Sequence, residues 1–214
     1  MTNLVFLASL SLGISAVVPA RVVAEGVADH PRGLRVGERA PVSGVYFACG
    51  AWAAEHQKTC PAARRGNDPK IAIYTTTLDE NVLNLALAVD RLIAGDATLK
   101  WSFVSVSDQK GGNVGVKSAD YYSKAELAQR LAELKTSAVH KGIQQLTLGI
   151  TSTGDSRERE KLGIPEDANV LVTFLDGDRR RSRLVKFVKP IHSSNLDAET
   201  IASLLEEIKV VRYQ

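Results

Sequence analysis

The sequence predicts an α/β domain of three layers, in which a mixed central sheet is flanked by helices. Apolar, β-branched runs alternate with segments of helical period, which is typical of parallel strands joined by helices. An Asp-Gly turn at Asp176 and Gly177 joins two such runs closely enough to make them antiparallel. The chain of 214 residues shows no internal repeat and no second boundary, so we expect a single domain.

The composition is that of an ordinary globular protein, with 44% hydrophobic and 24% charged residues. The 27 Lys and Arg residues against 24 Asp and Glu leave a formal net charge of +3. This is far below the excess of a dedicated nucleic-acid binder, so we expect no nucleic-acid partner. Two cysteines are too few for a small fold built on disulfides.

The N-terminal segment differs from the rest of the chain. Residues 1–20 contain no charged side chain, and residues 4–18 form an apolar run of the length of a secretory signal. Small residues at Ala20 and Ala24 suit a signal peptidase. We therefore predict a signal peptide over residues 1–24 and an exported protein, periplasmic or secreted, without a stable membrane span after cleavage. An uncleaved anchor helix is the alternative, although the run is short for a span.

An exposed lead-in over residues 25–41 is expected next, because this segment is rich in Gly, Arg and Pro without periodicity. The domain then covers residues 42–214. Its first strand is predicted at residues 42–48, around an apolar group, and a short helix at residues 51–59. Residues 70–77 (KIAIYTTT) are β-branched and apolar, which predicts a buried strand.

The first long helix is predicted to begin at the segment from Thr77 to Glu80, which has the spacing of a capping box. It should stop at Gly95, a residue favoured just after helix ends. Its inward face repeats every three or four positions, at Val82, Leu85, Val89 and Leu92. Residues 99–107 (LKWSFVSVS) are the next predicted strand.

The second half repeats this pattern. A capping box from Ser123 to Glu126 predicts another helix, followed by a strand at residues 145–151. One or two helical turns at residues 156–162 lead to a buried strand at residues 169–175. The rest of the predicted order is the Asp-Gly turn, a strand at residues 183–189, and a helix from Asn195 or Asp197. The strands separated by helices are expected to be parallel.

Three short segments resemble the redoxin group of thioredoxin-like proteins, which includes the peroxiredoxins. Residues 34–41 (LRVGERAP) resemble a VGxxAP motif, residues 162–164 (LGI) a YGI motif, and residues 174–177 (FLDG) an IDxxG hairpin. They occur in the order of that group, and with the element order the resemblance covers roughly residues 34–210. It implies a thioredoxin-like fold.

The resemblance does not extend to the active site. Those proteins carry a catalytic cysteine between the first central strand and its helix, where a helix N-terminus favours the thiolate. Here residues 74–79 read YTTTLD, without cysteine. The cis-proline expected near Ala168 or Asn169 is also missing, and Pro165 lies too early. The fold alone therefore does not supply the activity.

Cys49 and Cys60 both precede the first central strand. Residues 60–66 resemble the Cys-x-x-Cys-x-x-Gly segment of some exported thioredoxin-like proteins, with Ala63 at the second cysteine position. Export favours a structural disulfide between Cys49 and Cys60. Two alternatives stay open: buried thiols, or a redox pair in which Cys60 attacks and Cys49 resolves.

A metal site is a further alternative. Cys49, His56 and Cys60 have the spacing Cys-x6-His-x3-Cys and would offer three soft ligands to zinc or copper. No fourth ligand is evident in the sequence. We therefore expect no metal and no cofactor.

The sequence favours a non-catalytic binding or scaffold module of the cell envelope, acting on an unidentified protein partner. The alternative is a thiol-disulfide oxidoreductase or peroxidase-like enzyme, with Cys60 and Cys49 as its catalytic residues.

Overall fold

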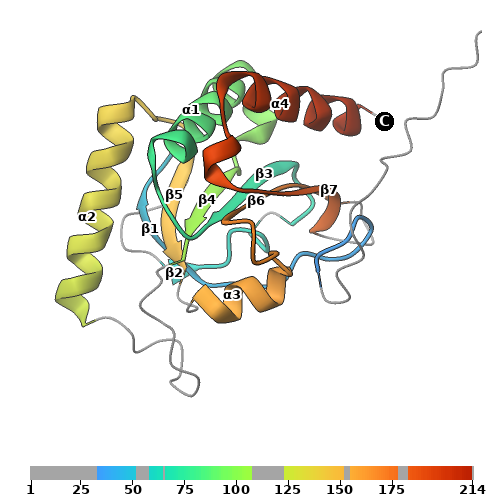
Figure 1. Ribbon diagram of the computed structural model, residues 1–214. Coiled ribbons are helices and arrows are strands. Elements are labelled where there is room, and N and C mark those ends of the chain that lie inside the picture. Colours follow the sequence, from blue (N-terminus) through green and yellow to red (C-terminus); the bar gives the residue numbers. More distant parts are fainter. Residues whose placement is uncertain are drawn as a thin grey trace, which may run out of the picture.

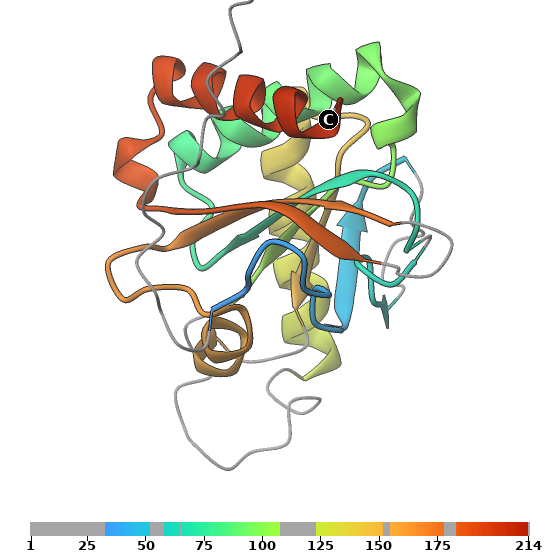
Figure 2. The same cartoon turned by 90° about the vertical axis from the view of Figure 1, so that its right-hand side faces the viewer.

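The computed structural model describes residues 33–51, 58–64, 66–107, 123–151, 155–177 and 183–213. In this part of the chain, seven strands form one sheet of order β2-β1-β5-β4-β3-β6-β7. Helices α1, α2 and α4 cover one face of the sheet and α3 covers the other (Figures 1 and 2). The strands are β1 (Val45–Cys49), β2 (Lys58–Thr59), β3 (Lys70–Thr75), β4 (Phe103–Val106), β5 (Thr147–Thr151), β6 (Val170–Asp176) and β7 (Leu184–Ile191). The helices are α1 (Glu80–Gly95), α2 (Lys124–Lys141), α3 (Asp155–Leu162) and α4 (Ala198–Arg212), with 3-10 turns η1 (Ala97–Leu99) and η3 (Ser193–Asn195).

The predicted three-layer α/β class is confirmed, and the strand directions refine it. Strands β3, β4 and β5 are parallel, and β6 and β7 form the antiparallel pair expected from the Asp-Gly turn. The expectation of parallel strands is wrong for β1 and β6, which run antiparallel to β5 and β3. For β6 the reason is its connection: the eight residues of α3 span only about 12 Å, so the chain re-enters the sheet at the end where β5 left it.

Helix caps explain where the long helices begin. The capping box of α2 is confirmed, since the Ser123 amide donates to Glu126 Oε2 (2.8 Å) and the Glu126 amide to Ser123 Oγ (3.2 Å). Helix α1 starts later than the capping box predicted from Thr77, because Asp79 is its N-cap and accepts from the Val82 amide.

Three other expectations change in the structure. Lys58 and Thr59 of the predicted helix form β2, and residues 52–57 lie outside the described ranges. Strand β4 starts only at Phe103, because Leu99 belongs to η1 and the amides of Lys100 and Ser102 bond back to that turn. The signal peptide also lies outside the described residues. Of the predicted exposed lead-in, Leu34 and Ala40 are buried and the segment between them pairs with β7.

Two apolar cores stabilise the layers. The larger lies between the sheet and α1, α2 and α4, and contains Ile71, Ile73 and Leu85. The smaller lies on the α3 face, with Tyr74 and Phe103 in an edge-to-face contact between ring centroids 5.7 Å apart. No helix within the described ranges is both long and apolar enough to cross a membrane.

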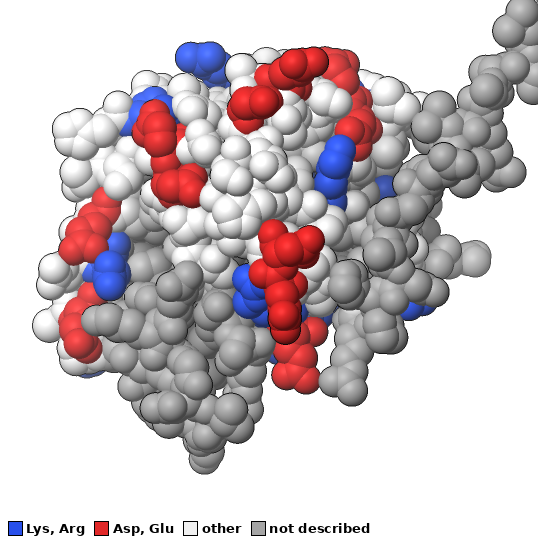
Figure 3. Space-filling view, in the orientation of Figure 1, with Lys and Arg blue, Asp and Glu red and all other residues white. Residues whose placement is uncertain are grey.

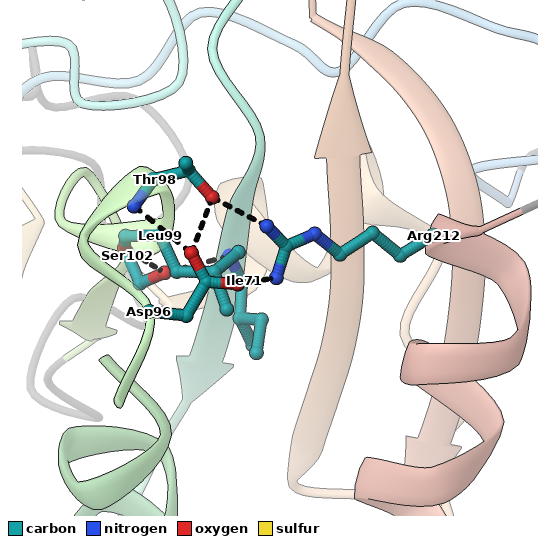
Figure 4. Close-up of polar contacts among 6 residues, drawn as sticks. All are labelled: Ile71, Asp96, Thr98, Leu99, Ser102 and Arg212. Atoms are coloured by element: carbon teal, nitrogen blue, oxygen red, sulfur yellow. Dashed lines mark hydrogen bonds and ion pairs between the residues drawn. The ribbon is translucent and has the colours of Figure 1, made fainter. Parts of the chain in front are cut away.

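A polar lock holds the C-terminal helix to the chain before β4. Figure 4 shows Arg212 at the end of α4 bonded to Asp96 and Thr98. The hydrogen bond from Arg212, followed by that from Thr98, lowers the pKa of Asp96 to about 2. Ser102 joins this region to β3, since its hydroxyl donates to the Leu99 carbonyl (2.7 Å) and accepts from the Ile71 amide (2.9 Å).

Candidate functional site

The position where a thioredoxin-like protein would carry its catalytic cysteine is the turn between β3 and α1, residues 75–79. The hydroxyl of Thr75 is bonded within this turn. Thr75 Oγ1 donates to the Thr77 carbonyl (2.6 Å) and accepts from the Thr77 amide (3.2 Å). We call these residues the β3–α1 turn. Residues 75–79 contain no cysteine, and the turn is closed by hydrogen bonds of Thr75 with Thr77.

The N-terminus of α1 is occupied by a carboxylate. Asp79 Oδ1 accepts from the Val82 amide at 2.9 Å. The exposed amides of a helix N-terminus carry partial positive charge that stabilises an anion, such as a thiolate. Because Asp79 already supplies that anion, the helix end is neutralised from within the chain.

Asn169, directly before β6, joins the β3–α1 turn to the segment after β7. Its carbonyl accepts from the Thr76 amide (3.1 Å), its Oδ1 accepts from the Ser193 amide (2.6 Å), and its Nδ2 donates to Ser193 Oγ (3.0 Å). Asn81 in α1 closes the network by donating to the Ser193 carbonyl (3.1 Å). This neutral network takes the place of the missing cis-proline, and the described residues contain no cis peptide bond.

Sequence reasoning missed this network. The sequence marks Asn169 only as a position without proline and predicts no role for Asn81. The available signal was an amide residue immediately before a buried strand, a position where side chains satisfy backbone groups left over by the sheet.

The structure does not bring Cys49 and Cys60 together. Val45 of β1 pairs with Thr59 of β2, so Cys60 follows one end of this ladder while Cys49 lies toward the other. Five residue positions at about 3.3 Å each separate them by about 16 Å, whereas the Cα atoms of a disulfide lie within about 7 Å.

The two thiols also face different cores. Cys49 packs against the larger core and Cys60 against the smaller one, on opposite faces of the sheet. Both are half-buried and do not form a disulfide with each other. The expected disulfide and the alternative redox pair are therefore not formed in this arrangement, in which Lys58 and Thr59, predicted as the end of a helix, form β2.

The distance between Cys49 and Cys60 also argues against the metal site considered in the sequence analysis. Cys49 and Cys60 are apart, and His56 lies outside the described residues. Among the residues that are described, no group of three or more His, Cys, Asp or Glu side chains is placed to hold a metal ion.

A charged cluster lies at the opposite end of β3. Lys70, the first residue of this strand, is fully buried, and its Nζ donates to the Arg64 carbonyl (2.8 Å). Burial lowers the pKa of Lys70 to about 8, and the charges of Asp68, Cys60 and Asp176 only partly oppose this. The burial of Lys70 was not predicted from the sequence, because a lysine at the start of a strand is usually exposed.

The topology defines the class. The parallel core β3-β4-β5, the antiparallel pair β6-β7 beside it, and helices on both faces make this a thioredoxin-like fold of the redoxin type. The fold implied by the resemblance is thus confirmed.

Comparisons with known proteins give similarity at the level of the fold alone. No family model matches the chain, and no curated protein sequence matches it. Among solved structures, a hypothetical protein from Sinorhizobium meliloti 1021 has a TM-score of 0.51 at 12% identity, over 84% of this chain and 85% of that chain. A peroxiredoxin-like protein from Aquifex aeolicus has a TM-score of 0.49 at 16% identity, over 82% and 88% of the two chains. A thiol peroxidase from Chromobacterium violaceum has a TM-score of 0.48 at 13% identity, over 83% and 89%. Identities this low concern the fold and not the activity.

Proposed function

We propose that the chain is an exported thioredoxin-like binding module of the cell envelope that performs no thiol chemistry at the usual position of its fold. The observation that carries this proposal is the Asp79 cap on α1. A carboxylate at that helix end satisfies the amides that would otherwise stabilise a thiolate, and it would repel one placed beside it.

The β3–α1 turn suits binding rather than catalysis. Four hydrogen bonds among Thr76, Asn81, Asn169 and Ser193 hold its shape without a titratable group. Exposed polar residues flank it, namely Glu80, His192, Ser194 and Asn195. A rigid polar surface of this kind loses little conformational entropy when a protein partner docks.

The surface charge supports a protein partner over a nucleic acid. On the face shown in Figure 3, acidic and basic side chains are scattered among uncharged ones, without a large basic patch. Binding to a phosphate backbone needs a concentration of positive charge.

The first test is enzymatic. Residues 25–214 and the double variant Cys49→Ser/Cys60→Ser are assayed for peroxide consumption with dithiothreitol and for reduction of insulin disulfides. Both proteins should show the rate of the reagent blank. Turnover by the parent chain that disappears in the double variant would contradict the proposal and favour the thiol enzyme.

The second test concerns binding. Asn195→Arg changes the surface beside the β3–α1 turn, whereas Lys100→Glu changes an exposed residue before β4, at the other end of the sheet. Tagged versions are isolated from the cell envelope after cross-linking, and the sizes of their complexes are compared. Asn195→Arg should lose a complex that Lys100→Glu retains. Equal behaviour of the two variants would place the binding surface elsewhere.

A further inference from the structure

Lys70 is a buried lysine whose ammonium is hydrogen-bonded to the turn formed by residues 60–64. Its side chain lies on the α3 face of the sheet, as does that of Ala72 two positions along β3. It is 0% exposed to solvent. The Arg64 carbonyl accepts from its Nζ, so the ammonium is bonded to residues 60–64.

The same turn carries one of the two thiols. The Arg64 amide donates to the Cys60 carbonyl (2.9 Å), which closes residues 60–64 into a turn. Ala62 in its middle is buried at 2% exposure and packs in the smaller core. The bond from Lys70 to Arg64 therefore fastens the segment with Cys60 to the start of β3.

The charge on Lys70 opposes this arrangement. Transfer of an ammonium from water to an apolar interior is unfavourable unless other charges offset it. The titratable groups that act on Lys70 are Asp68 in the loop before β3, Cys60 in the turn and Asp176 at the end of β6. Together they fail to offset burial, since the pKa of Lys70 is lowered to about 8.

We propose that residues 60–64 form a pH-sensitive latch: protonated Lys70 favours opening of the turn and exposure of the Cys60 thiol, and neutral Lys70 keeps it closed. In the open state water reaches the ammonium, so protonation stabilises that state. The neutral amine keeps its hydrogen bond to Arg64 without the penalty of a buried charge. The latch is independent of the binding function proposed above.

The test uses Cys60 as the probe in a Cys49→Ser background. The rate of alkylation by iodoacetamide is measured for the folded protein and for the urea-unfolded protein at each pH. Their ratio reports opening of the turn, because the unfolded chain corrects for thiol ionisation. The ratio should fall by about tenfold or more between pH 7 and pH 9.5. A ratio that stays constant over this range would overturn the latch.

Two variants test whether Lys70, rather than another titratable group, causes the pH dependence of this ratio. Lys70→Met should remove the pH dependence of the ratio, and an unchanged dependence would contradict the proposal. Asp68→Asn removes a charge that favours protonated Lys70 from a partly exposed position of the loop and keeps a side chain of the same size. It should raise the ratio at pH 7 and leave it unchanged at pH 9.5, which keeps the proposal testable if Lys70→Met does not fold.

A matched probe distinguishes opening of the turn from unfolding of the domain. In a Cys60→Ser background, alkylation of Cys49 reports on the opposite face of the sheet. Its ratio should change with pH clearly less than that of Cys60. The same change at both cysteines would mean that Lys70 acts on the whole domain, and the local latch would be wrong.

Discussion

The two ends of β3 satisfy their polar groups in opposite ways. At the end that leads into α1, Thr75 bonds to the backbone of Thr77 and Asn169 bonds to Ser193, all without charge, while the carboxylate of Asp79 caps the helix. At the beginning of the strand, Lys70 is buried with a charge at neutral pH, near Asp176 and Cys60. The usual position of thioredoxin-like chemistry therefore holds a neutral hydrogen-bond network beside an acidic helix cap, whereas a buried ammonium lies at the far end.

This difference separates stability from pH sensitivity within one strand. Neutral hydrogen bonds keep their strength over the physiological pH range, because none of their groups titrates there. A buried ammonium changes its contribution as soon as its proton is lost. We therefore expect the Asn169–Ser193 network to contribute equally to stability at pH 7 and pH 9.5, and Lys70 to contribute differently above and below pH 8. Substitutions at Lys70, Asn169, Asp79 and Asp96, with their controls, test the two ends of the strand.

The largest effect is expected for Lys70→Met. The pKa of Lys70 in the folded protein, about 8, lies below the ordinary lysine value of 10.5, so the unfolded chain binds the proton more tightly. Burial of the charge thus lowers stability fully below pH 8, and the penalty disappears as pH rises to about 10.5. The variant should be more stable than the parent at pH 7 by up to about 3 kcal/mol and show no such gain at pH 10.5.

Urea unfolding of both proteins across this range checks the difference, because titration of the remaining lysines and tyrosines is common to both. A gain that is equal at pH 7 and pH 10.5 would mean that methionine packs better and that charge is irrelevant. That result would remove the contrast between the two ends of β3.

The second effect is expected for Asn169→Leu at the neutral end. The substitution leaves the amide and hydroxyl of Ser193 without their partner, and Ser193 is buried at 4% exposure. The free energy of unfolding should fall by about 2 kcal/mol at both pH 7 and pH 9.5. Asn195→Ala, an exposed asparagine in η3, is the control and should change it by less than about 0.5 kcal/mol. A loss that varies with pH would show that the network contains a charge after all.

The sequence predictions succeeded for features set by neighbouring residues and failed for contacts between residues distant in the sequence. Local signals were sufficient for β3, for the α2 capping box and for the antiparallel pairing of β6 with β7, because each depends on nearby residues. The Asn169 network joins residues 24 positions apart and the Asn81 bond spans 112, so no local pattern encodes them. The separation of the cysteines depended on β2, a strand of two residues whose pairing is set by β1.

Lys70 shows a different limit of sequence reasoning. The run after it correctly predicted a buried strand, but a lysine at the first position is compatible with solvent or with burial. Only the turn at residues 60–64, which folds over it, decides between the two. Composition contains no information about that contact.

The third effect is expected at the N-cap of α1, where substitutions of Asp79 and Thr77 show which of the two residues caps the helix. Asp79→Ala should lower stability by about 1 kcal/mol, because the Val82 amide loses its acceptor. Asp79→Asn should cost much less, since an amide oxygen also accepts this bond. Thr77→Ala should have little effect, because only the backbone of Thr77 takes part in the turn. Thermal unfolding of the three variants checks this order, and a larger loss for Thr77→Ala would restore the sequence prediction.

The smallest effect is expected for the lock between Asp96 and Arg212, which joins α4 to the chain before β4 (Figure 4). The pKa of Asp96 is about 2 in the folded protein against 3.8 ordinarily, so the pair stabilises the fold fully above about pH 4 and loses its effect as pH falls to 2. Solvent screens this partly exposed pair, so the contribution is about 1 kcal/mol at most. Asp96→Asn should therefore be less stable than the parent at pH 6 and equal to it near pH 2, by urea unfolding. With Lys70→Met, this variant measures the charge effects at the early end of β3. The penalty from Lys70 is lost above pH 8 and the stabilisation by Asp96 is lost below pH 4, whereas both contributions are constant in the interval between them.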